Sequence, residues 1–172
     1  LAVFTAGFIT VLFSLISIHE ATSEMYNQGL IGIENLIEAD RDAYQSSIAI
    51  ADLFISGSGA SAEKQKELYD AVDSNLVQVR ERFDKFTAVY ALVSDVKHPA
   101  FGVFESNYAL LSANTNKVKT LLTSFDISAA RDVYSGAYSQ SFEAARGAMD
   151  ELTNVMLAET ERAIDESTQV AD

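Results

Sequence analysis

Few side chains in this sequence could do catalytic chemistry, and their spacing does not suit it. The 172 residues include two histidines, His19 and His98, and no cysteine. Di-iron helical enzymes hold their metals through paired Glu-x-x-His motifs, and neither histidine has a glutamate three residues before it. No other set of histidines and carboxylates has metal-ligand spacing, and neither histidine suits a Ser-His-Asp triad. We therefore predict a protein that is not an enzyme and that carries neither a metal nor another cofactor.

Four charges fall within the sequence EADRD, which begins at Glu38 inside an apolar, helix-forming segment. On a heptad frame set by Leu30 and Ile37, Asp40 falls at an inward position. On the same frame Glu38 and Asp42 point outward, as charges on a solvated helix face usually do. A carboxylate that faces a core must be paired or it costs several kcal/mol, so Asp40 needs a basic partner.

Two arginines lie at the depth of Asp40 when residues are counted from the predicted turns. These are Arg146 on the last helical segment and Arg80 on the second. Arg41 falls beside the apolar seam at the same level. The first interpretation of this cluster is a structural ion pair that fixes the register of the helices. The alternative is that Asp40 contacts a ligand directly.

Farther along the first helix, a polar group faces a run of tyrosines at helical spacing. Tyrosine suits a recognition surface because it combines a rigid apolar ring with a hydroxyl that donates or accepts. An arginine at the start of that run could bind one carboxylate through two hydrogen bonds. The candidate ligand-binding residues are Tyr44, Gln45, Ser47, Arg131, Tyr134 and Tyr138. The alternative is that the tyrosines of the last segment are core residues.

Long helices must position these residues, and the composition favours them. One proline and eight glycines leave room for few turns. The turn-forming stretches SGSGASA, KHPAFG and SFDIS divide the chain, and they offer Ser61 and Ser128 as N-caps and Pro99 as a first-turn residue. The predicted helices cover about 19–55, 61–97, 99–124 and 128–172.

Apolar residues recur in each segment at spacings of three and four, the period of one buried helical face. The predicted seam of the first helix is Leu30, Ile33, Ile37, Tyr44, Ala51 and Phe54. The predicted seam of the second is Leu68, Val72, Leu76, Val79, Phe83, Phe86, Tyr90 and Val93. That of the third is Phe104, Tyr108, Leu111, Val118, Leu122 and Phe125. Such helices joined by short connections predict an all-α fold, an antiparallel up-down-up-down four-helix bundle.

Residues 1–18 carry no charge and are long enough for a transmembrane helix, which needs about 17 to 25 residues. We predict that they form such a helix, clipped at its N-terminus, and that the first bundle helix continues from it. A buried core helix and a signal peptide are the alternatives. Residues 19–172 then form the extracytoplasmic domain. The net charge of −13 argues against nucleic acid and anionic lipid as partners.

This layout resembles the extracytoplasmic sensor domain of a bacterial methyl-accepting chemotaxis receptor. The stretch IEADRDAYQ is similar to parts of the first helix of such domains, and MLAETERAIDES is similar to their last helix. The resemblance implies a homodimer anchored in the bacterial inner membrane, with its sensor domain in the periplasm. It also implies a ligand site near the distal dimer interface and signalling by displacement of the last helix.

The basic residues depart from the pattern of the amino-acid-sensing members. Those members place several arginines on the first helix, whereas here that helix has only Arg41, among acids. An amine, a neutral solute or a periplasmic binding protein is therefore as compatible with the sequence as a carboxylate. Two other functions stay open: the sensor domain of a histidine kinase, and a membrane-tethered structural bundle without a ligand.

Overall fold

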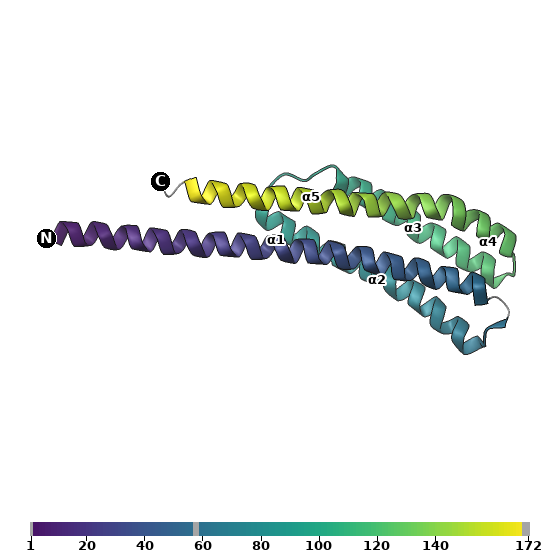
Figure 1. Ribbon diagram of the computed structural model, residues 1–172. Helices are drawn as coiled ribbons and strands as arrows, with labels where there is room; N and C mark the ends of the chain where they lie inside the picture. Colours follow the sequence, from purple (N-terminus) through teal and green to yellow (C-terminus); the bar gives the residue numbers. More distant parts are fainter. Residues whose placement is uncertain (1, 57–58, 170–172) are drawn as a thin grey trace.

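A computed structural model gives the fold of this chain, which is the predicted all-α four-helix bundle (Figure 1). The structure describes the backbone of residues 2–56 and 59–169, and the side chains of residues 20, 22–56 and 59–166. Its elements are α1 (Ala2–Ser56), α2 (Ala62–Val93), α3 (Ala100–Thr123), α4 (Ile127–Val133), the π-helical turn η2 (Tyr134–Tyr138) and α5 (Ser139–Gln169). The last three are continuous and form the fourth helix of the bundle.

Each helix of the bundle packs against two neighbours. The first helix, α1, contacts α2 on one side and α5 on the other, and α3 contacts α5. Aromatic rings join α2 to α3, where the rings of Phe83 and Phe104 stack with centroids 3.5 Å apart. Because consecutive helices run in opposite directions, α1 begins and α5 ends at the same end of the bundle (Figure 1).

The helix boundaries follow local capping chemistry. Ser61 is the predicted N-cap of α2, and its Oγ accepts a hydrogen bond from the backbone N–H of Lys64 at 3.2 Å. Pro99 occupies the N-cap position of α3, where its missing N–H costs no helical hydrogen bond. The prediction of Ser128 as an N-cap is wrong, because the Asp126 carboxylate accepts from the N–H of Ala129 and α4 begins earlier.

The predicted seam of α2 is confirmed, since every member from Leu68 to Tyr90 is buried and Val93 is half-buried. Val72, Val79, Phe83 and Phe86 are among the largest side chains that are fully buried in the described part of the protein. Full burial of one such side chain contributes about 1.5 to 3 kcal/mol. The seam of α3 is confirmed as far as Leu122, but Phe125 is 78% exposed.

The predicted seam of α1 is wrong at three of its six members and lies one position from the most buried face, whereas Ile33, Ala51 and Phe54 are half-buried. Leu30, Ile37 and Tyr44 are 48%, 61% and 44% exposed. The buried positions among the described side chains of α1 are Gly29, Gly32, Leu36, Ala39, Asp42, Ala43, Ser46, Ala49, Ile50 and Leu53. One residue is a rotation of about 100° on a helix. The core therefore meets a face that combines small residues with Leu36, Ile50 and Leu53, while Leu30, Ile37 and Ile48 lie on an outer face.

Within the side chains that the structure describes, no helix is both long enough and apolar enough to span a membrane. The predicted transmembrane span, residues 1–18, lies outside those side chains.

Candidate functional site

An ion pair between Asp40 and Arg146 joins α1 to the fourth helix. Arg146 donates from Nε to Asp40 Oδ1 at 2.6 Å and from Nη2 to Oδ2 at 3.2 Å. The hydrogen bond to Asp40 also raises the pKa of Arg146 above its ordinary value. The guanidinium carbon lies 4.1 Å from the centroid of the Tyr44 ring. Asp40 is half-buried and meets Arg146, one of the two arginines that the sequence placed at its depth.

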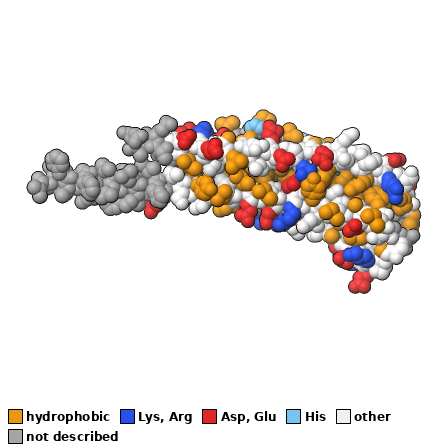
Figure 2. All heavy atoms as spheres, in the orientation of Figure 1, with side chains coloured by type: hydrophobic (Ala, Val, Ile, Leu, Met, Phe, Trp, Pro, Cys, Tyr) orange, Lys and Arg blue, Asp and Glu red, His pale blue; other side chains and the backbone are white. Residues whose placement is uncertain are grey.

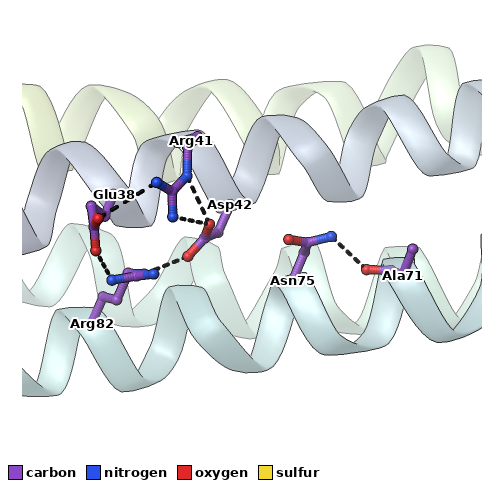
Figure 3. A network of polar contacts seen from close by, with 6 residues as sticks. All are labelled: Glu38, Arg41, Asp42, Ala71, Asn75 and Arg82. Atoms are coloured by element: carbon purple, nitrogen blue, oxygen red, sulfur yellow. Dashed lines mark hydrogen bonds and ion pairs between the residues drawn. The ribbon is translucent and has the colours of Figure 1, made fainter.

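A second charged network joins α1 to α2, and the sequence did not predict it (Figure 3). Asp42, which was predicted to point outward, is completely buried. It accepts from Arg82 Nε at 2.5 Å and from Arg41 Nη2 at 3.0 Å. Glu38, also predicted to point outward, is half-buried and pairs with both arginines. The one-position rotation of α1 explains both errors, because it turns Asp42 toward α2.

Arg80 does not reach the EADRD cluster. It donates to Asp84 on its own helix, and from Nη1 to Glu105 Oε2 of α3 at 2.5 Å. The hydrogen bond to Asp84 raises the pKa of Arg80 and lowers that of the Asp84 carboxyl. Arg80 therefore joins α2 to α3. The three arginines 80, 82 and 146 each connect a different pair of helices.

The candidate ligand residues come together only in part. Tyr134 and Ser47 meet, with 3.2 Å between the tyrosine hydroxyl and Ser47 Oγ. The Tyr134 ring stacks on Tyr138 at 4.9 Å between centroids and packs on Phe54 at 5.3 Å. The exposed Arg131 guanidinium lies 6.0 Å from the Phe54 ring. These contacts place four of the six residues around one contact between α1 and η2.

The remaining candidates lie elsewhere. Tyr44 contacts Phe142 edge-to-face at 5.5 Å between centroids, and it belongs with Arg146 rather than with Tyr134. Gln45 is exposed on a different side of α1. Sequence spacing placed all three residues of α1 at one level, but residues one and three positions apart point in different directions around a helix and therefore meet different neighbours.

The backbone at Tyr134 is π-helical, which no signal in the sequence indicated. Turns of this kind within α-helices occur frequently at functional sites. At the end of the turn Tyr138 is buried, and its hydroxyl makes no hydrogen bond of normal geometry among the described residues, although it lies close enough to the Ser47 side chain for that group to oppose the rise in its pKa. Burial raises the pKa of Tyr138 to about 12. The hydroxyl is therefore protonated at neutral pH and able to donate a hydrogen bond.

An exposed apolar stripe follows the outer face of α1. Its members are Tyr26, Leu30, Ile37, Tyr44, Ile48 and Ile55, each at least 44% exposed. They recur four and seven residues apart, which keeps them on one side of the helix. On the face drawn in Figure 2, hydrophobic side chains gather along the middle of the rod, over α1.

In the described part of the chain, no group of three or more histidines and carboxylates is placed to hold a metal ion. A family described as a four helix bundle sensory module for signal transduction matches residues 1–171 of the sequence. Searches of curated proteins and of solved structures found no match.

Proposed function

The chain belongs to the four-helix-bundle sensory modules for signal transduction, as its resemblance predicted, and we propose that it is the extracytoplasmic ligand-sensing domain of a membrane chemoreceptor. Such a module is not catalytic. The domain binds a small solute near the distal end of a dimer and signals by displacement of its last helix. Residues 1–18 are its membrane anchor, and the sensor domain lies in the periplasm of a bacterium.

The contact between Ser47 and Tyr134 carries the proposal for the ligand site. It joins α1, near the outer apolar stripe, to the π-helical turn of the fourth helix. A ligand that hydrogen-bonds to these two hydroxyls replaces their mutual bond and changes the distance between the helices. Tyr138 adds a buried donor at the end of the same turn. Arg131 adds an exposed cation beside it.

The outer apolar stripe of α1 supports the homodimer. Ile37 and Ile48 are 61% and 58% exposed, and a second copy of α1 would cover them through heptad packing. Two copies that each carry a net charge of −13 repel each other, so the attraction between them in a dimer must come from apolar contacts along this stripe. Tyr44 belongs to the same stripe, and Ser47 lies one turn farther along the helix. The proposed ligand site therefore lies beside the dimer axis.

The fourth helix is positioned to transmit the signal. From the Ser47–Tyr134 contact to the Asp40–Arg146 ion pair is about 10 Å along α1, in the direction of the membrane end. The 31 residues of α5 then continue along α1. A shift of about 1 to 2 Å is typical of helices that move at subunit interfaces. A shift of that size at η2 reaches the membrane end because α5 is one continuous helix.

Replacing Tyr134 with phenylalanine tests the ligand site. A screen of small polar metabolites by thermal shift identifies a compound that raises the Tm of the chain. We expect Tyr134→Phe to weaken the binding of that compound about tenfold, because it removes one hydrogen bond to the ligand. The matched control is Tyr108→Phe, which deletes the hydroxyl that donates to Leu76 O on the α2–α3 side. Equal affinity in all three proteins would exclude the site.

A charge in the apolar stripe tests the dimer. Ile37→Asp should weaken dimerisation at least tenfold, because it forces an unpaired carboxylate into the contact. Its monomer should fold normally, since Ile37 is 61% exposed. Leu110→Asp is the control, with a similar exposed side chain on α3, 55% exposed. Sedimentation velocity measures both. If the two variants dimerise alike, the stripe is not the interface.

A further inference from the structure

A cleft of about 200 Å³ opens at the distal end of the bundle, away from the Ser47–Tyr134 contact. It lies between α1, α2, the end of α3 and the start of α4. Its lining residues are Leu53, Gln65, Tyr69, Leu122, Thr123, Phe125 and Ile127. Leu53 directly precedes Phe54, which packs on Tyr134, and consecutive residues of a helix point about 100° apart. The cleft therefore opens on another side of α1 than the proposed ligand site.

Phe125 holds an unusual backbone conformation at the mouth of this cleft. Its φ is 63°, the only positive value among the described residues other than glycine. The N–H groups of Phe125 and Asp126 donate to Leu122 O and Leu121 O, so α3 ends in a Schellman motif with Phe125 at C′. Glycine is the usual residue there, because a side chain is strained in the left-handed region. The side chain of Phe125 is 78% exposed, so packing within the protein does not account for the strained backbone at this position.

We propose that the distal cleft binds a small, uncharged aromatic molecule and that the Phe125 ring covers it. A cavity of about 150 Å³ holds benzene, so a cleft of about 200 Å³ fits a single substituted ring. Larger drug-sized ligands need about 300 Å³ or more. The strained position keeps the Phe125 ring at the mouth of the cleft, where it can pack on an aromatic ligand.

The described part of the cleft wall offers no charged group to bind an ionic ligand. None of the described residues that line it is charged. Lys119 Nζ lies 5.9 Å from the centroid of the Tyr69 ring and is paired with Asp73, with 2.6 Å between Nζ and Oδ2. The hydroxyl of Thr123 donates to Lys119 O at 2.8 Å and can still accept a hydrogen bond from one polar substituent. This second site goes beyond the proposed function and does not depend on it.

Phenol is a suitable probe, because it is a single ring with one hydroxyl. In an amide NMR titration of the isotope-labelled chain, we expect saturable shifts at the cleft residues with a dissociation constant of about 1 mM or below. Benzoate has the same ring with a carboxylate, and it should bind at least tenfold more weakly because the wall offers its charge no partner. Shifts that are absent, or that occur equally with benzoate, would overturn the proposal.

Two variants test the role of the ring. Phe125→Gly should raise the Tm by about 2 to 4 °C, because glycine removes the backbone strain, yet weaken phenol binding about tenfold. Gln65→Phe should fill the cleft and abolish binding without altering the mouth. Tyr134→Phe should leave phenol binding unchanged, so failure of the proposed ligand site is distinguishable from failure of this one. Unchanged phenol affinity in both cleft variants would overturn the proposal.

Discussion

Replacing Arg82 with alanine should lower the free energy of unfolding by about 3 kcal/mol. Asp42 is completely buried, and Arg82 Nε lies 2.5 Å from its Oδ2. After the substitution the only cation left on Asp42 among the described side chains is Arg41, whose side chain is 50% exposed and solvated. A buried carboxylate that loses its main partner keeps its desolvation penalty without the compensating attraction. Urea unfolding followed by circular dichroism measures the loss.

The matched control for Arg82 is Arg80, which has the same side chain but whose partners are exposed to water. Arg80→Ala leaves Asp84 and Glu105, which are 58% and 47% exposed and can be hydrated. We expect it to cost about 1 kcal/mol or less. The double variant Asp42→Leu, Arg82→Met should recover most of the lost stability, because no buried charge remains. If Arg82→Ala costs no more than Arg80→Ala, Arg41 alone neutralises Asp42.

The bundle was predictable because its signals are local. Few breakers, three turn-forming stretches and a sustained period of three and four residues specify four helices and their order. On α2 one face is clearly more apolar than the others, and the seam from Leu68 to Tyr90 follows it. Such a helix has only one way to face a core.

The register of α1 was not predictable because the helix has two apolar faces. The face of large residues, with Leu30 and Ile37, gives the stronger pattern, but the bundle buries the face that contains Gly29, Leu36 and Ala43. Small residues allow neighbouring helices to approach closely, and periodicity alone does not say which face meets which partner. This single error also turned Asp42 outward in the prediction and concealed its pairing with Arg82.

The candidate site was predictable as a region and not as a set of contacts. The spacing of Arg131, Tyr134 and Tyr138 placed them on one helix face opposite Ser47. The π-helical turn changes that spacing locally, and no residue type specifies such a turn. Phe125 was assigned to the seam of α3 because it continues the apolar period. Because α3 ends in a Schellman motif, the Phe125 side chain instead points out of the bundle.

The second large effect on stability is expected at the close contact between α1 and α5, near the end of the bundle where α1 begins and α5 ends. A Cβ on Gly29 would lie 2.7 Å from Cγ2 of the buried Thr160, and a Cβ on Gly32 would lie 2.7 Å from Met156 Cε. Met156 ends in a flexible side chain that can move. Thr160 is β-branched and its Oγ1 donates to Met156 O at 2.7 Å, so it cannot move easily. The Gly29 contact is therefore the rigid one.

We expect Gly29→Ala to lower the free energy of unfolding by about 2 kcal/mol, because α5 must move away from α1. The sign is informative, since alanine in place of glycine within a helix ordinarily stabilises by about 0.5 to 1 kcal/mol. Gly147→Ala is the matched control on α5, where an added Cβ has no atom within 4 Å. That variant should gain stability. Urea unfolding of the two variants gives effects of opposite sign.

A double-mutant cycle assigns the loss to the contact between α1 and α5. Thr160→Ala removes Oγ1 and Cγ2, which leaves only Cβ near the new methyl group, at 3.1 Å. The substitution alone should destabilise slightly, because it opens a small cavity in the core. Combined with Gly29→Ala it should recover at least half of the loss, since the two changes are complementary in volume. Additive losses would mean that Gly29 matters for the backbone of α1 and not for its distance from α5. Recovery would show that the side chains at positions 29 and 160 set the distance between α1 and α5, so that the helix displacement we propose would have to act on the first helix at this contact.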